Sequence, residues 1–78
     1  MIALLLAVSL AAPVRALAEK VEAELEAWDL AGATRALDEL SQEHPDSAET
    51  SYLRGRVLFE QGRYDEATKA YALAEERG

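Results

Sequence analysis

Few side chains in this 78-residue sequence have types that could perform covalent or acid–base chemistry. His44 is the only histidine, Ser41 lies three residues before it, and cysteine is absent. A serine–histidine pair needs a third group to orient the imidazole and donors to hold an oxyanion, and no pattern here supplies them. The absence of cysteine also removes thiol nucleophiles and thiolate metal sites. We therefore expect no catalytic residue and no enzymatic activity within this chain, and we interpret His44 as a structural residue near a helix end.

Two carboxylates have a spacing that could serve a metal ion. Glu22 and Glu26 are four residues apart, which places both on one face of a helix. Sites built from oxygen ligands need several further ligands, and the sequence has no EF-hand loop and no His-Glu pattern. The glycines are scattered singly, so no phosphate-binding loop is predicted either. We expect a solvated acidic face, with no metal and no cofactor.

Composition and charge restrict the class of partner. The chain has 15 acidic and 8 basic residues and a net charge of −7. Nucleic-acid binding depends on Lys and Arg to neutralise phosphates, so a nucleic-acid partner is not expected. Half of the residues are hydrophobic but only 6% are aromatic, and most of the apolar residues are Ala and Leu. This composition favours packed helices over disorder.

An internal repeat organises most of the chain. The tetrapeptide at 33–36, Ala-Thr-Arg-Ala, recurs with one conservative change at 67–70, which is 34 positions later. At the same offset, Leu30 is paired with Tyr64 and Leu37 with Tyr71. Small residues therefore match small residues and large apolar residues match large ones. Repeats of this length are typical of arrays in which each unit buries its apolar face against the next.

Helical periodicity and capping signals divide the repeats into four helices, and no segment alternates with the period of a strand. The backbones of packed helices could approach closely at three small residues, Gly55, Ala67 and Ala74. The space between the helices would be filled by larger side chains, those of Leu58, Tyr64 and Tyr71. Trp28 is expected to anchor the first turn. The first helix is expected from Glu19 to Trp28, the second from the Asp29 cap to His44-Pro45, the third from 46–49 to Gly62, and the fourth from Tyr64.

The first eighteen residues have the pattern of a secretory signal peptide. Residues 1–12 carry no charged side chain, and this run is too short to span a membrane. The pattern Ala16-Leu17-Ala18 predicts cleavage after Ala18, and a weaker alternative follows Ser9-Leu10-Ala11. Export, to a bacterial periplasm or the medium, is the main interpretation. A buried first helix is the alternative, because no basic residue precedes the apolar run.

Residues 19–78, and most clearly 48–78, resemble the tetratricopeptide repeat family, whose unit is a 34-residue helix–turn–helix. The residues that carry the resemblance are Tyr52, Gly55, Leu58, Gly62, Tyr64, Ala67, Tyr71, Ala74 and the preceding Pro45. The stretch at 14–47 is a weaker match, with Trp28 where the family prefers the turn glycine. Arg63 replaces the usual Asp cap, and Arg54 replaces a bulky apolar residue. The resemblance implies an all-α fold of antiparallel helical hairpins, stacked as a fragment of a solenoid that continues in a longer protein.

The resemblance also implies a binding module. In this family the first helices of successive units line a concave groove that holds a peptide or a partner helix. The positions that would line the groove here are Glu49, Tyr52, Arg56, Phe59, Glu60, Glu22, Leu25 and Glu26. Tyr52 and Phe59 could instead belong to the core, and the period alone does not decide between the two.

Three functions remain open at this point. The first is an exported scaffold that binds a protein or peptide and performs no chemistry. The second is the accessory part of an exported enzyme, such as a hydrolase, whose catalytic domain lies beyond Gly78. The third is a helical hairpin protein that associates with itself through an exposed apolar edge.

Overall fold

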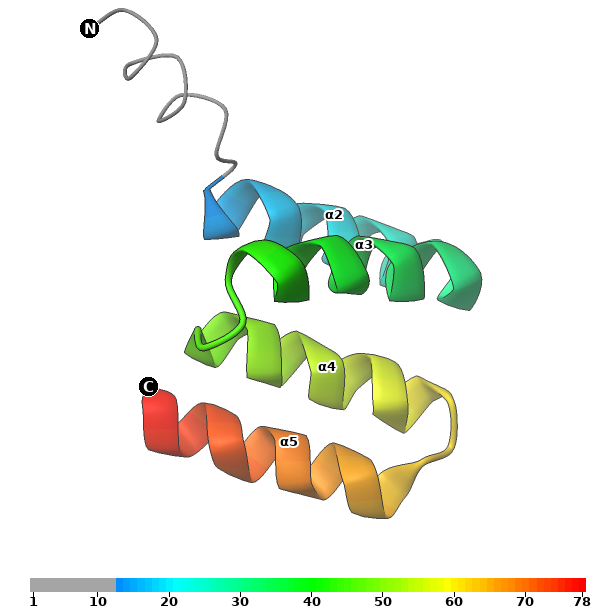
Figure 1. Cartoon of the computed structure of the whole chain (residues 1–78). Coiled ribbons are helices and arrows are strands. Elements are labelled where there is room, and N and C mark those ends of the chain that lie inside the picture. The colour runs from blue at the N-terminus through cyan, green and yellow to red at the C-terminus, as the bar shows by residue number, and fades with distance from the viewer. Residues whose placement is uncertain (1–12) are drawn as a thin grey trace, which may run out of the picture.

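The computed structural model describes residues 13–78, which form four α-helices and no strand. The helices are α2 (Val14–Glu26), α3 (Leu30–Glu43), α4 (Ala48–Glu60) and α5 (Tyr64–Arg77). Figure 1 shows two antiparallel hairpins, α2 with α3 and α4 with α5, arranged so that α4 lies between the first hairpin and α5. The predicted fold class, an all-α array of stacked helical hairpins, is confirmed.

The two hairpin turns have the same hydrogen bonds, displaced by one repeat. In the first turn the N–H of Trp28 donates to the carbonyl of Leu25, and the N–H of Asp29 donates to the carbonyl of Glu24. The equivalent residues of the second turn make the equivalent bonds, at 2.9 Å each: Gly62 to Phe59 and Arg63 to Leu58. Both turns therefore use the left-handed helix ending that favours glycine. The sequence repeat is a repeat of backbone geometry.

Trp28 holds the position in the first turn that Gly62 holds in the second. Both residues have positive φ, 58° at Trp28 and 82° at Gly62. The expectation that Trp28 anchors the turn is wrong, because its side chain is 76% exposed. Its side chain extends into solvent while its backbone adopts a conformation that costs an L-residue about 1–2 kcal/mol.

Replacing Trp28 with glycine is expected to stabilise the fold. Relief of the left-handed strain outweighs the extra freedom that glycine gains in the unfolded chain, so we expect a net gain of about 0.5–1 kcal/mol. A thermal melt of Trp28→Gly should show a midpoint a few degrees higher. The matched control is Gly62→Ala, where a Cβ would meet nothing within 4 Å, so only backbone strain acts and the midpoint should fall. A lower midpoint for Trp28→Gly would contradict this account.

The second helix of each hairpin begins differently. Asp29 caps α3, because its Oδ1 accepts a hydrogen bond of 2.9 Å from the backbone N–H of Gly32. Arg63, the equivalent residue, makes no cap and instead pairs with Glu66 at 2.6 Å. Ser47 caps α4 by accepting from the N–H of Thr50 at 3.0 Å. The departure from the family pattern at Arg63 therefore has a structural consequence, which is an uncapped α5.

The capping bond of Asp29 makes part of the stability depend on pH. The N–H of Gly32, and then a hydrogen bond with the Glu24 side chain, hold the pKa of Asp29 below its ordinary value of 3.8. A carboxyl group with a lowered pKa in the folded state stabilises the fold above its unfolded pKa, and this contribution is lost as the pH falls through the folded value. Asp29→Asn keeps a capping oxygen but cannot titrate. The melting temperature should fall less between about pH 4 and about pH 2 for Asp29→Asn than for the parent chain. An equal decrease in both chains would contradict the role of Asp29.

The hydrophobic core lies mainly between the first hairpin and α4. Among residues 13–78 the buried cluster consists of Leu17, Ala18, Val21, Leu25, Ala33, Ala36, Leu37, Leu40, Leu53 and Val57. Eight of these residues come from α2 and α3, and α4 inserts Leu53 and Val57 among them. Two polar contacts fix the register of this interface. Arg54 donates to the Ser41 hydroxyl at 2.6 Å, and Arg15 pairs with Glu49 at 3.0 Å. Arg54, which departs from the family pattern, thus bridges the two hairpins.

The first helix begins earlier than the sequence predicts. It begins at Val14, after Pro13, whereas Glu19 was expected to be its first residue. The added turn is part of the core, since Leu17 is 5% exposed and Ala18 is fully buried. The predicted apolar region of the signal peptide, residues 1–12, lies outside the described residues. Within the described part of the chain, no helix is both long and apolar enough to cross a membrane.

Candidate functional site

The residues predicted to line a groove on α4 lie along one stripe of that helix. Tyr52 is 46% exposed and Phe59 is 50% exposed, although both are large apolar side chains. Glu60 is exposed, and Glu49 and Arg56 are half-buried. The structure therefore offers two aromatic rings to solvent beside a guanidinium and two carboxylates. This combination suits an amphipathic protein segment.

The predicted groove residues on α2 divide between the surface and the core. Glu22 is half-buried and Glu26 is exposed, so both carboxylates face solvent at least in part. Leu25 is 5% exposed and belongs to the buried cluster. Because α2 packs against α4, the acids of α2 and the stripe on α4 belong to neighbouring helices. Leu25 supports this surface from beneath and does not form part of it.

Each exposed aromatic ring of α4 pairs with a tyrosine of α5. The rings of Tyr52 and Tyr71 have centroids 5.8 Å apart, and those of Phe59 and Tyr64 meet edge to face at 5.0 Å. Tyr71 also covers Gly55, where a Cβ would come within 2.6 Å of its ring. This close packing is why only glycine fits there, and burial raises the pKa of the Tyr71 phenol above its ordinary value of 10.0. The aromatic residues thus form a surface shared by α4 and α5.

An apolar hollow lies between α4 and α5 at the Tyr52–Tyr71 pair. It has a volume of about 500 Å³ and is lined by Ala48, Glu49, Tyr52, Tyr71, Ala74 and Glu75. The hollow is shallow and mainly apolar, and its lining includes one carboxylate from each helix. Such an arrangement can hold an apolar side chain and pair with a base beside it.

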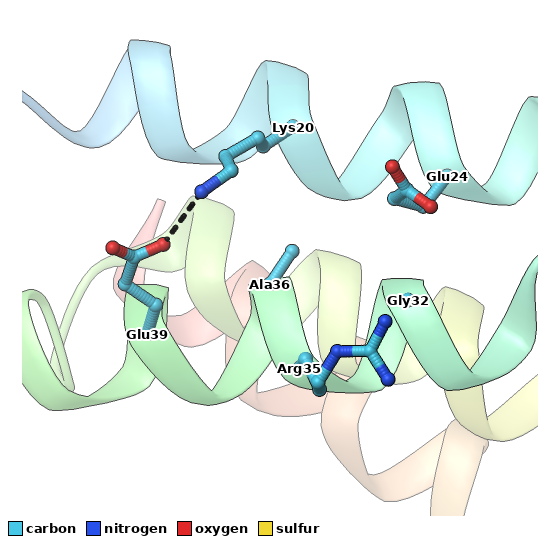
Figure 2. Close-up of a pocket in the computed structure, with 6 residues that line it drawn as sticks. All are labelled: Lys20, Glu24, Gly32, Arg35, Ala36 and Glu39. Carbon is cyan, nitrogen blue, oxygen red and sulfur yellow. Dashed lines mark hydrogen bonds and ion pairs between the residues drawn. The ribbon is translucent and has the colours of Figure 1, made fainter.

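A second hollow lies on the other side of the molecule, between α2 and α3. Figure 2 shows its side chains, which alternate in charge along the two helices. Its volume is about 210 Å³, and its lining is Lys20, Glu24, Gly32, Arg35, Ala36 and Glu39. Lys20 and Glu39 pair across the hollow at 3.0 Å, as the dashed line marks. With two acids and two bases in balance, this hollow lacks the charge bias that would select a ligand.

The residues singled out for possible chemistry lie at the end of α3. Among residues 13–78, no group of three or more His, Asp or Glu side chains is placed to hold a metal ion. His44 follows α3, and its backbone carbonyl accepts a hydrogen bond of 2.7 Å from the Thr50 hydroxyl. Ser41 is occupied by Arg54. The residues singled out for possible catalysis therefore lie where they connect α3 to α4.

Sequence reasoning missed the contribution of α5 to this surface. Tyr71 was assigned to the space between helices, and Ala48 and Glu75 were given no role. The signal that could have found them is the repeat itself, since Tyr71 and Ala74 correspond to Leu37 and Leu40, which are buried at the contact with α4. The positions that are buried between the hairpins in the first repeat, Leu37 and Leu40, are half-buried in the second, at Tyr71 and Ala74.

Comparison with known proteins agrees with the repeat geometry. No curated protein and no solved structure matches the chain. A family model for the tetratricopeptide repeat matches residues 16–78, which include all of α3, α4 and α5 and most of α2. The paired helices, the repeated turn and this match lead to one assignment. The chain belongs to the tetratricopeptide repeat family, whose units serve as protein-interaction modules.

Proposed function

We propose that this protein is an exported scaffold that binds a segment of another protein along the face shared by α2 and α4. The observation that carries the proposal is the exposure of Tyr52 and Phe59 on α4. Large aromatic side chains beside an arginine are the residues on which protein interfaces most depend. Its mechanism is recognition by shape and charge, without a chemical step.

The charge of this face indicates the kind of segment that would bind. Arg56 is accompanied by four carboxylates, those of Glu22, Glu26, Glu49 and Glu60, all at least partly exposed. A segment with basic residues beside apolar ones would pair with the acids while covering the rings. The preferred ligand is therefore a basic, partly apolar peptide or helix.

A selected peptide can test this face. A peptide chosen from a display library for binding to the 78-residue chain should bind at least tenfold more weakly to Tyr52→Ala, because loss of an aromatic anchor costs about 1.4 kcal/mol or more. Arg56→Glu should strengthen binding of a basic peptide, because it replaces the one base of this face with an acid, whereas Arg35→Glu, the same change on the outer side of α3, should leave the affinity unchanged. If Arg35→Glu has an equal effect, the assignment of this face is wrong.

The proposal of export depends on the segment before α2. Cleavage after Ala18 would cut within α2 and remove Leu17 and Ala18 from the core. Cleavage after Ala11, at the weaker of the two predicted sites, would leave α2 complete. We therefore place processing after Ala11. Amino-terminal sequencing of the protein from the envelope of an expressing bacterium should find Ala12 first; finding Glu19 first, or Met1 in the cytoplasm, would contradict this placement.

A further inference from the structure

The exposed surface of the second hairpin corresponds, position by position, to a surface of the first hairpin that is already occupied. The six residues that line the hollow between α4 and α5 lie 34 positions after six residues of α2 and α3. The six equivalents are Val14, Arg15, Ala18, Leu37, Leu40 and Ser41.

In the first hairpin these equivalent positions hold α4. Ala18, Leu37 and Leu40 are buried in the cluster that receives Leu53 and Val57, and Val14 packs at its edge. The two polar positions bind specific side chains of α4, because Arg15 pairs with Glu49 at 3.0 Å and Ser41 accepts from Arg54 at 2.6 Å. The contact between α4 and the first hairpin is therefore a template for what the second hairpin can accept.

The lining of the hollow between α4 and α5 differs from this template in its charged residues and in its aromatic rings. Where the first hairpin presents Arg15 and Ser41, the second presents Glu49 and Glu75. Where it presents Ala18 and Leu37, the second presents the Tyr52–Tyr71 pair. The two tyrosine faces and the Glu75 carboxylate favour a cation. Glu49 already pairs with Arg15 through its Oε1, so its other oxygen is the one that can accept from a base of the occupant. An occupant built like α4 would therefore carry bases at the positions of Glu49 and Arg54, and apolar side chains at those of Leu53 and Val57.

We propose that the α4–α5 surface lined by Tyr52, Tyr71, Ala74, Glu49 and Glu75 docks a basic amphipathic helix of a protein partner. The helix carries two apolar residues that are four positions apart. One base directly follows the first apolar residue, and a second base lies four positions before that same apolar residue. This surface lies at the side of the second hairpin away from the first, and it shares only Glu49 and Tyr52 with the face assigned under the proposed function. Either proposal can fail while the other stands.

A second copy of this chain fits the surface poorly. The helix of a second copy that corresponds to α4 is α2, which has bases at both required positions, Arg15 and Lys20. However, Glu19 stands at the position of Leu53, so self-docking would press a third carboxylate between Glu49 and Glu75. Both bases are also already paired within the chain, Arg15 with Glu49 and Lys20 with Glu39.

A synthetic helix tests the proposal directly. The probe is a fluorescent peptide with the sequence of residues 47–61 carrying Glu49→Lys, which has the required pattern of bases and apolar residues. It should bind the 78-residue chain, and binding should weaken at least tenfold for Glu75→Lys. The matched control is Glu76→Lys, the same charge change one residue later outside the lining, which should bind within twofold of the parent chain. Adding Arg54→Glu to the peptide should restore its binding to Glu75→Lys.

Three results would overturn the proposal. One is the absence of peptide binding to the parent chain at millimolar concentration. Another is equal weakening by Glu75→Lys and Glu76→Lys, which would mean that the peptide binds elsewhere, for example by displacing α4 from the first hairpin. The third is a dimer in sedimentation of the parent chain that Tyr71→Asp dissociates, since a second copy would then occupy the surface. If the Arg56→Glu chain binds the peptide with the same affinity as the parent chain, the peptide occupies the α4–α5 surface and not the face shared by α2 and α4.

Discussion

Deleting residues 1–18 is expected to unfold this protein, whereas deleting residues 1–12 leaves it folded. The longer deletion removes the first turn of α2, with Leu17 and Ala18, both of which lie in the core. Truncating one buried leucine costs about 2–5 kcal/mol, and single cores of this size rarely supply more than about 3–5 kcal/mol in total. The shorter deletion leaves Pro13 and every residue of α2 in place.

Circular dichroism of the two truncated chains checks this expectation. The chain that begins at Pro13 should give a helical spectrum and a cooperative thermal transition. The chain that begins at Glu19 should lose most of its helical signal at the same temperature. A cooperative transition of equal midpoint in both chains would show that residues 13–18 are dispensable, and would favour processing after Ala18 over processing after Ala11.

Leu53→Ala is expected to unfold both hairpins together. Leu53 is 1% exposed and belongs to the cluster that α2 and α3 dominate, so its removal leaves a cavity between the hairpins. We expect a loss of about 2–5 kcal/mol, large enough to unfold much of the population at room temperature. The physical reason is that neither hairpin buries its apolar face without the other.

Urea unfolding followed at two places measures this coupling. The comparison variant is Leu73→Ala, a leucine truncation on α5 at a half-buried position, which should cost clearly less. The amide signals of α3 in the nitrogen-labelled chain report on the first hairpin and far-ultraviolet circular dichroism reports on all helices, so the two signals should give one transition in the parent chain. Separate transitions, or equal losses for Leu53→Ala and Leu73→Ala, would refute the coupling of the hairpins.

Much of the architecture was predictable because the repeat signals are local. The offset of 34 residues identifies the two hairpins, Gly62 marks a left-handed turn, and Asp29 marks a helix start. These signals depend on the conformation of a few neighbouring residues, which sequence alone describes well. Even the departures from the family pattern had meaning, as Arg63 caps nothing and Arg54 bridges the hairpins.

The start of α2 could not be predicted in the same way. Ala16-Leu17-Ala18 is an apolar, small-residue segment that serves equally well as a cleavage site and as a helix turn packed in a core. Only the three-dimensional packing shows that Leu17 and Ala18 are buried. The environment of Trp28 was misjudged for a related reason, since its spacing fits a packed face but its positive φ directs the side chain into solvent.

The residues proposed for binding on α4 could be chosen from the repeat, but their burial could not be predicted. Tyr52 and Phe59 could be core or surface, and the structure exposes half of each ring. Leu25, the equivalent of Phe59, is buried. Burial at these positions is decided by which helix packs above them, and the period of the sequence carries no information on that. For the same reason the part played by α5, through Tyr71 and Glu75, was missed.

We propose that this chain binds protein segments through surfaces centred on α4. The most direct test is to titrate a display-selected peptide into the nitrogen-labelled 78-residue chain and map the amide chemical shifts. The account predicts that the largest changes occur on α4 around Tyr52 and Arg56, and along the sides of α2 and α5 that adjoin it. If the largest changes instead cluster around Lys20, Arg35 and Glu39, on the outer side of α2 and α3, the account is contradicted.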